Sequence, residues 1–193
     1  MSHLMIIVDL NEMDYDGSQL KHCLAYEYRA VLGPSICFFI GTADVKKHLV
    51  DLEDSFAGDF IKSERMAHFI IEIPNIGIQE AVVWQRLFIR MIAREIGKDT
   101  ENLEIEINGD DIMLAGDKLS VSIATLSRFS GLIHVGINIH AGKDCPVPAI
   151  GLADITNGFG IFTDEHAWTQ YIAHIFADEY TDIVNATYKV IER

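Results

Sequence analysis

The chain has 193 residues, 49% of them hydrophobic, and a formal net charge of −14 at pH 7. This length suits a single domain spanning residues 1–193, which can bury most of its surface in a core. Lysine and arginine form no cluster, so we expect no nucleic-acid partner, because phosphate binding depends on clustered positive charge.

The first residues predict neither a signal peptide nor a membrane span. The opening MSHLMIIVDL has no positively charged start, and its apolar run breaks at Asp9. We therefore expect a cytoplasmic protein without a membrane partner. The three cysteines, Cys23, Cys37 and Cys145, share no metal-ligand spacing, which predicts reduced thiols in a cytosolic fold.

The first half of the chain predicts a mixture of strands and helices. Ser18 can cap a helix that Gly33 and Pro34 stop, and a second helix carries an apolar stripe at helical spacing that includes Trp84 and Phe88. In chain order we predict a strand at 3–10, a helix at 19–32, a strand at 36–40, a loop-rich segment at 41–65, a strand at 66–73 and a helix at 78–96.

The stretch from Leu103 to His140 predicts an antiparallel meander. Apolar and polar residues alternate through it with the period of half-buried strands, and Asn108-Gly109 supplies a tight hairpin turn. We predict four strands here, the first from Leu103 to Ile107 and the others at 111–114, 118–125 and 132–140, followed by a last helix at 164–190. The class is therefore α+β, an antiparallel or mixed sheet with helices packed on one face.

The last two strands of the meander should each have an apolar and a polar face, because successive side chains point to opposite sides. Leu119, Val121 and Ile123 are expected to face a core together with Ile133, Val135, Ile137 and Ile139. The opposite face carries Lys118, Ser120, Ser122, His134, Gly136, Asn138 and His140. This polar face either meets water, as one face of an antiparallel sheet commonly does, or floors a ligand site.

Metal and acid–base sites remain open from the residues alone, and the sequence does not identify a metal. His68, Glu72, His134 and His140 on neighbouring strands could in principle bind zinc. Asp51, Glu53 and Asp54 could instead hold magnesium, although a solvated acidic loop is the simpler interpretation. Hydrolysis by a pair such as His68 and Glu72 is a further hypothesis, which requires the two groups to be within hydrogen-bond reach.

The meander also resembles the central segment of biotin and lipoate protein ligases. The resemblance rests on three runs in the same order: Gly109-Asp110-Asp111-Ile112, Gly116-Asp117-Lys118-Leu119-Ser120 and His134-Val135-Gly136-Ile137-Asn138. It covers roughly 40 residues. It implies that Lys118 occupies the position of the ligases' catalytic lysine and Asp111 that of the aspartate near their metal and phosphates. ATP with Mg²⁺ is the cofactor that this resemblance suggests.

A second resemblance covers nearly the full chain. It is carried by Tyr15-Asp16-Gly17-Ser18, Val50-Asp51-Leu52-Glu53-Asp54, Met66 to Glu72, Gln85-Arg86-Leu87 and Lys118 to Thr125. These segments are similar to domain-of-unknown-function family 366. That resemblance implies a fold related to biotin ligases and class II aminoacyl-tRNA synthetases, with no established activity.

Two hypotheses for function follow. In the first, the chain is a ligase or acyl transferase that binds a nucleotide and a small carboxylic acid, with Lys118 stabilising negative charge on phosphate oxygens. In the alternative it is a non-catalytic module that binds a small molecule, because Val121 replaces the ligases' glycine and no Gly- and Arg-rich adenylate loop is present. The candidate binding residues are Arg65, His68, Glu72, Asp110, Asp111, Ser120, Ser122, His134 and Asn138. A small-molecule ligand is the expected partner, and a homodimer remains open.

Overall fold

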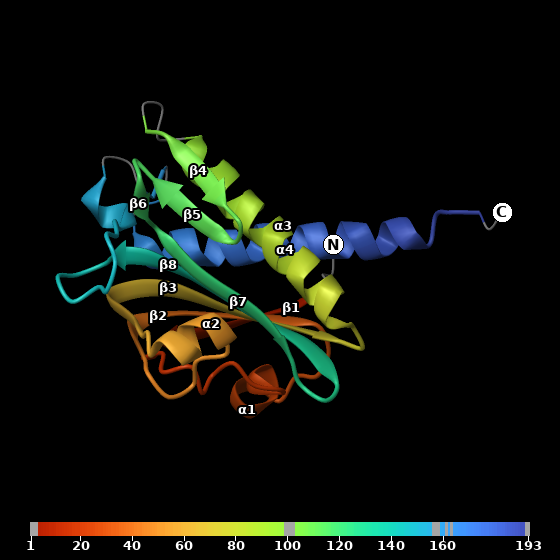
Figure 1. Ribbon diagram of the computed structural model, residues 1–193. Helices are drawn as coiled ribbons and strands as arrows, with labels where there is room; N and C mark the ends of the chain where they lie inside the picture. The colour runs from red at the N-terminus through yellow and green to blue at the C-terminus, as the bar shows by residue number, and fades with distance from the viewer. Residues whose placement is uncertain (1–3, 99–102, 156–158, 161, 163, 192–193) are drawn as a thin grey trace.

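The computed structural model describes residues 4–98, 103–155, 159, 160, 162 and 164–191. A five-stranded sheet in the order β1-β2-β3-β8-β7 forms its centre, and a small sheet in the order β4-β5-β6 lies beside α3 (Figure 1). The strands are β1 Ile6–Glu12, β2 Ser35–Val45, β3 Ile61–Pro74, β4 Ile105–Asn108, β5 Asp111–Leu114, β6 Asp117–Lys118, β7 Ser120–Leu126 and β8 Ser130–His140. The helices are α1 Leu24–Arg29, α2 Leu52–Ala57, α3 Ile78–Gly97, the short 3-10 helix η1 Leu152–Asp154 and α4 Glu165–Thr187.

The central sheet is mixed. β1 runs parallel to β2, whereas β2, β3, β8 and β7 pair antiparallel in turn. The three inner strands are long and buried along most of their length, because apolar side chains alternate to both faces of the sheet. The α+β class and the mixed sheet agree with the prediction from the sequence.

One face of the sheet is covered by the two long helices, α3 and α4. Phe88 of α3 packs edge-on against Phe69 of β3 at a ring-centroid distance of 5.2 Å and lies 4.5 Å from Phe176 of α4. Trp84 and Ile92 extend this contact along α3, at the spacing of one helical face. Burial of these aromatic and branched side chains provides the main hydrophobic core.

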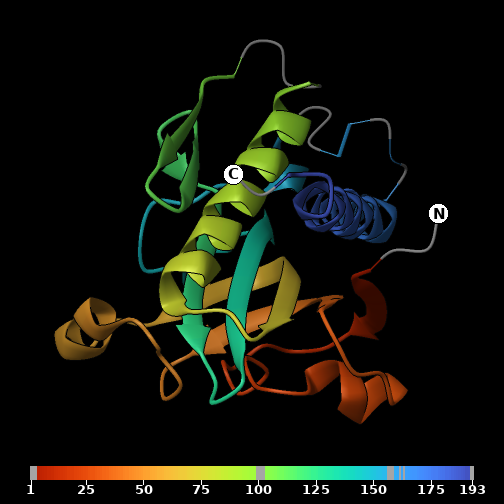
Figure 2. The same ribbon diagram turned by 90° about the vertical axis from the view of Figure 1, so that its right-hand side faces the viewer.

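The opposite face of the sheet carries a second, smaller core rather than a wetted surface. Phe39 and Ile70 of the sheet pack there against Val8, Tyr15 and Leu24. α1 and α2 lie on this side, away from α4 (Figure 2). The interpretation that the polar face of the meander simply meets water is therefore wrong, because His134 and Asn138 of that face are buried.

Two predicted segments differ from the structure in the first half of the chain. The helix expected over 19–32 is reduced to α1, because Cys23 and Ala30 at its two ends adopt left-handed backbone conformations with φ of 62° and 54°. The segment expected to be loop-rich instead extends β2 to Val45, forms α2 and begins β3 at Ile61. Strands form there through pairing with residues distant in the sequence, although the segment itself has no strand-like alternation of apolar and polar residues.

The predicted four-stranded meander is divided between two sheets. The strand expected over 118–125 breaks at Leu119, so that β6 pairs with β5 and β7 pairs with β8. Leu119 is buried in the main core, and Ser120, the next residue, is buried on the same side of the chain instead of the opposite side. From Ser120 onward, the alternation of side chains is therefore shifted by one residue. A one-residue shift moves every later side chain to the other face of a strand.

As a result, the predicted faces of β7 are inverted. Ser122 pairs with Val135, which places it on the face turned to α3, whereas Val121 pairs with Gly136 and Ile123 with His134. The faces predicted for β8 are correct, since Ile133 to Ile139 enter the main core at alternate positions. Across the described part of the chain, no helix has the length and apolar character needed to cross a bilayer.

Candidate functional site

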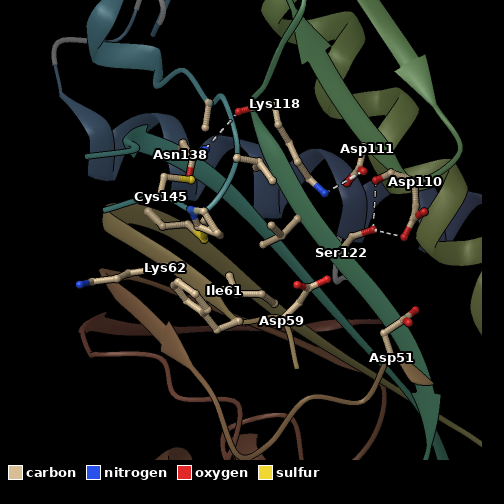
Figure 3. A pocket seen from close by; sticks show the side chains of 16 residues that line it. Asp51, Asp59, Ile61, Lys62, Asp110, Asp111, Lys118, Ser122, Asn138 and Cys145 are labelled. Carbon is tan, nitrogen blue, oxygen red and sulfur yellow. Dashed lines mark hydrogen bonds and ion pairs between the residues drawn. The ribbon is translucent and has the colours of Figure 1, made fainter. Parts of the chain in front are cut away.

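A cavity of about 320 Å³ lies where β7, the start of β3 and two loops meet (Figure 3). This volume is at the lower end of the range of small-molecule sites. Its lining residues are Asp51, Asp59, Phe60, Ile61, Lys62, Met66, Asp110, Asp111, Lys118, Val121, Ser122, Asn138, Cys145, Pro146, Val147 and Ala149. Five of the candidates predicted from the sequence are therefore brought together here: Asp110, Asp111, Lys118, Ser122 and Asn138.

Lys118 and Asp111 form an ion pair in the cavity wall. The Nζ atom of Lys118 lies 2.8 Å from Oδ2 of Asp111, and each side chain is 30% exposed. Burial raises the pKa of the Asp111 carboxyl, and the neighbouring Lys118 ammonium opposes that rise. The backbone of Lys118 pairs with one neighbouring segment, since its N–H donates to the Pro148 carbonyl at 3.1 Å and its carbonyl accepts from the Ile150 N–H at 3.1 Å. The main-chain pairing thus fixes the backbone of Lys118, and the contact with Asp111 orients its ammonium.

Asp110 is oriented from α3. The side-chain amide of Gln85 donates to Asp110 Oδ2 at 2.8 Å and to Ser122 Oγ at 2.7 Å, and Ser122 Oγ donates to Asp110 Oδ2 at 3.0 Å. Arg86 approaches the other carboxylate oxygen at 3.5 Å. Gln85 is only 3% exposed. This network fixes one carboxylate at the edge of the cavity beside the Lys118–Asp111 pair.

Asn138 enters the cavity from β8. Its Nδ2 donates to the Lys118 carbonyl at 3.3 Å, and its Oδ1 accepts from Ser63 Oγ at 2.9 Å. Ser120 does not line the cavity. Its hydroxyl is fully buried and accepts the backbone N–H of Ile112 at 2.7 Å, which joins the small sheet to the large one. Its role is structural.

His134 and His68 lie behind the main cavity. His134 lines a smaller cavity of about 70 Å³ together with Tyr15 and Asp51. Its ring stacks on Tyr15 at a centroid distance of 4.0 Å, and its Nε2 lies 3.1 Å from His68 Nδ1. Burial lowers the pKa of His68 to about 3 and that of His134 well below its usual range, so both rings are neutral at pH 7.

Glu72 and Arg65 lie outside the cavity. Glu72 accepts hydrogen bonds near the start of α1, from the backbone N–H of Cys23 at 2.8 Å and from Ser130 Oγ at 2.7 Å. Arg65 forms an ion-pair cluster with Glu12 and Glu165. Neither residue contributes to the pocket that holds Lys118, although both carry charge on a strand that reaches it.

The alternative sets proposed from the sequence are not assembled. His68 and Glu72 are four residues apart on β3, which separates them by about 13 Å along the strand, and each has its own partners. His140 instead approaches Asp154 at 3.6 Å. These positions exclude both the His68–Glu72 acid–base pair and the zinc set. Of the acidic trio, Asp51 lines the cavity and Glu53 is exposed, while the side chain of Asp54 lies outside the described residues.

Sequence reasoning missed several residues of the site. Gln85 could have been found, because a glutamine occupies a helix position in line with Ala81 and Phe88 where an apolar residue is expected. Asp59 lies in the segment for which the sequence showed no clear period of apolar residues.

The lining of the cavity carries four aspartates and two lysines, so its charge balance is negative. An anionic ligand would need a cation beside it in this environment.

Comparison with known proteins identifies relatives over nearly the whole chain. The family described as Domain of unknown function (DUF366) matches residues 4–191. An uncharacterized protein of Methanocaldococcus jannaschii, MJ0805, is 31% identical over 159 residues, which cover 79% of this chain and 71% of that protein. A solved protein of unknown function from Pyrococcus horikoshi is 32% identical with a TM-score of 0.86, covering 98% of this chain and 99% of the other.

More distant structures share the fold alone. A biotin protein ligase from Leishmania major, solved in complex with biotin, aligns with a TM-score of 0.58 at 13% identity and covers 97% of this chain and 81% of its own. Structures of biotin and putative lipoate protein ligases align in the same way. The predicted similarity to the core of these ligases is therefore confirmed at the level of the fold.

Proposed function

The chain belongs to the DUF366 family, a domain of unknown function, and we propose that its cavity binds a small carboxylic acid and a nucleotide in order to activate the acid. The observation that carries this proposal is the Lys118–Asp111 pair at 2.8 Å in the cavity wall. An ammonium group beside two carboxylates is the arrangement expected at a phosphate site, where the ammonium and a divalent cation held by the carboxylates together balance the phosphate charge.

The residues of the cavity fit a magnesium-bound nucleotide better than a free one. Asp110 and Asp111 offer the oxygen ligands that Mg²⁺ prefers, and Lys118 offers a positive charge to phosphate oxygens. A free phosphate would meet four aspartates and only two lysines. The expected ligand is therefore a nucleotide whose charge is partly neutralised by Mg²⁺.

Each cavity residue then has a defined task. Lys118 would exchange its contact with Asp111 for phosphate oxygens and stabilise the negative charge that develops on them. Asp110, held by Gln85, would keep the cation in place, while Asn138 would orient the acid by hydrogen bonds. When bound, Mg-ATP would supply the α-phosphorus atom that the carboxylate attacks, and pyrophosphate would be the leaving group.

A second candidate function is supported by the space around Gly136. The side chains of Val121 and Met66 stand beside this glycine, so close that an added Cβ would lie 3.1 Å from Val121 Cγ2 and 2.3 Å from Met66 Sδ. Both side chains line the cavity, so they reduce the space that a large ligand such as an adenylate could occupy. This packing favours a module that binds one small molecule and consumes no nucleotide.

Binding measurements separate the two candidates. We would compare wild type with Lys118→Ala by thermal shift and calorimetry, using Mg-ATP with and without biotin, lipoate or octanoate, and repeating each titration in EDTA. A ligand at 100 times its Kd stabilises the fold by about 2.7 kcal/mol, which raises Tm by roughly 5 to 10 °C for a chain of this size. Lys98→Ala, which removes a lysine paired with Glu95 outside the cavity, is the matched control.

The two functions predict different results. Activation of an acid requires a Mg-dependent shift with ATP that Lys118→Ala abolishes and Lys98→Ala preserves, together with pyrophosphate release when the correct acid is added. A shift with an acid alone, and none with any nucleotide, would contradict the activation proposal and support the binding module.

A further inference from the structure

We propose that His22, Cys23 and Glu72 form a binding site for zinc or for a similar divalent transition-metal ion. One ligand atom from each residue, an imidazole nitrogen, the Cys23 sulfur and a carboxylate oxygen, can be chosen so that all three lie within 4.8 Å of one another. The site is separate from the cavity, because Glu72 lies six residues along β3 from Met66, about 20 Å away. The function proposed for Lys118 does not depend on it.

The strands and the start of α1 bring the three side chains together. Glu72 projects from the central sheet and is 7% exposed, and the segment leading into α1 lies over it. The backbone N–H of Cys23 donates to Glu72 Oε2 at 2.8 Å, while His22 Nδ1 lies 2.5 Å from Glu72 Oε1. Consecutive residues therefore direct an imidazole and a thiol toward one buried carboxylate.

The chemistry of the three ligands suits zinc. Zinc binds imidazole nitrogen and carboxylate oxygen at about 2.0 to 2.2 Å and thiolate sulfur at about 2.3 Å, which places the ligand atoms of a tetrahedral site roughly 3.3 to 3.8 Å apart. The spread of up to 4.8 Å in this cluster needs a side-chain adjustment of about 1 Å. An ion at the centre would replace the contact between His22 and Glu72. Three protein ligands leave one position for water.

The surroundings have the features of a metal site with access to solvent. Ser130 is 2% exposed and donates to Glu72 Oε1, so it orients the carboxylate as outer partners of metal ligands commonly do. The ring of Phe129 lies 5.5 Å from that of His22 and covers part of the cluster. The His22 side chain is 41% exposed, which leaves an entry path for the ion.

A hydrogen-bonded cluster without metal is the competing interpretation. It explains the contacts among His22, Glu72 and Ser130, but it assigns no task to the Cys23 thiol. In the absence of metal, burial and then the charge of Glu72 raise the pKa of that thiol, so it is protonated. Metal binding would release the proton to form a Cys23–metal bond. The participation of the sulfur therefore distinguishes the two interpretations.

Cobalt substitution reports on the sulfur directly. The untagged full-length chain would be treated with chelator, dialysed, and titrated with Co²⁺ and Zn²⁺ while absorption, metal content and Tm are followed. We expect one ion per chain, a thiolate-to-cobalt charge-transfer band, and a rise in Tm with Zn²⁺. Cys23→Ser should lose the band, whereas Cys145→Ser, which removes another partly exposed cysteine, should keep it.

Two further variants keep the test independent of Cys23. His22→Gln should weaken Zn²⁺ binding by about 100-fold or more, and Ser130→Ala by about 10- to 100-fold, because it removes only an outer partner. Wild type that binds no ion, a charge-transfer band that survives Cys23→Ser, or an unchanged zinc affinity in His22→Gln would each overturn the proposal. None of these results bears on nucleotide binding at Lys118.

Discussion

His68 and His134 face each other from adjacent strands of the central sheet, with 3.1 Å between Nδ1 of the first and Nε2 of the second. Both rings are fully covered, and among the described residues the Nε2 atom of His68 has no hydrogen-bond partner. The ring of Phe39 stacks on His68, and that of Tyr15 stacks on His134. A neutral pair is accommodated here, whereas a charged ring would lose its hydration, a cost that the charge of Asp14 offsets only in part.

We expect this pair to make folding sensitive to acid. The unfolded chain takes up protons on histidine below about pH 6.5, while His68 in the folded chain stays neutral down to about pH 3. The unfolded state therefore binds more protons between these values, and the free energy of unfolding falls as pH falls through this window, by about 1.4 kcal/mol per pH unit for each histidine. Urea unfolding from pH 7 to pH 5 measures the slope.

The variant His134→Leu tests whether the buried histidines cause the acid sensitivity. The quantity compared is the change in the free energy of unfolding per pH unit, not the free energy of unfolding itself. It removes one buried histidine, so the loss of stability per pH unit should be smaller by about 1.4 kcal/mol than in wild type. His48→Gln is the control, because the His48 side chain is exposed in the folded chain. An equal slope in wild type and His134→Leu would show that other groups cause the acid sensitivity.

Gln85 is expected to contribute to stability as well as to the site. Gln85→Leu would remove the amide that donates to Asp110 and to the hydroxyl of Ser122, leaving Arg86 as the contact of Asp110 on α3. Loss of hydrogen bonds to partly buried polar groups should cost about 1 to 3 kcal/mol in the free energy of unfolding. Val83→Ala, at a position 65% exposed on the same helix, should change it by less than about 0.5 kcal/mol. Equal effects of the two variants in chemical denaturation would contradict this role.

The sequence was sufficient for the fold class, and two of its candidate residues, Lys118 and Asp111, lie next to each other in the structure. The alternation of Ile133 to Ile139 correctly predicted the core face of β8, because a regular strand keeps its period of two. Lys118 and Asp111 came from the resemblance to ligases, and the hairpin around Gly116 brings them together. Local pattern and family resemblance thus selected two residues that the structure places side by side in the cavity wall.

The remaining features depend on long-range geometry that local patterns do not contain. The break at Leu119 shifts the alternation in β7, and nothing before it in the sequence requires a change of sheet. The pairing of Arg65 with Glu165 and of Glu72 with His22 joins segments 100 and 50 residues apart. Such contacts are fixed by how the sheet and the loops pack, so candidate residues on one strand were separated into different sites.

Gly136 should be sensitive to the smallest possible substitution. The Cβ atom of Gly136→Ala would lie 2.3 Å from Met66 Sδ, so Met66 must move within the cavity floor. Overpacking of this kind typically costs about 1 to 3 kcal/mol in the free energy of unfolding. Gly77→Ala is the control, because its Cβ would meet no heavy atom within 4 Å and its φ of −88° suits alanine.

A double variant tests whether the clash is the cause. Met66→Ala removes the side chain that the new Cβ would meet, so the two substitutions should be less destabilising together than the sum of their separate effects. Thermal and urea unfolding of both single variants and the double variant provide the cycle. Strict additivity would mean that Gly136 is required for another reason.

The Lys118–Asp111 pair predicts how the pKa of the Asp111 carboxyl should change when Lys118 is replaced. Burial raises the pKa of Asp111 while the Lys118 ammonium lowers it, so Lys118→Met should raise that pKa further by removing the opposing charge. Carboxyl-carbon NMR titration of labelled aspartate would follow Asp111 directly, with Lys98→Met as the control for loss of a lysine elsewhere. An unchanged or lower pKa in Lys118→Met would mean that the two groups are not paired in solution. Since the proposed exchange of Asp111 for phosphate starts from this pair, the titration also tests whether Lys118 is held in position before a ligand binds.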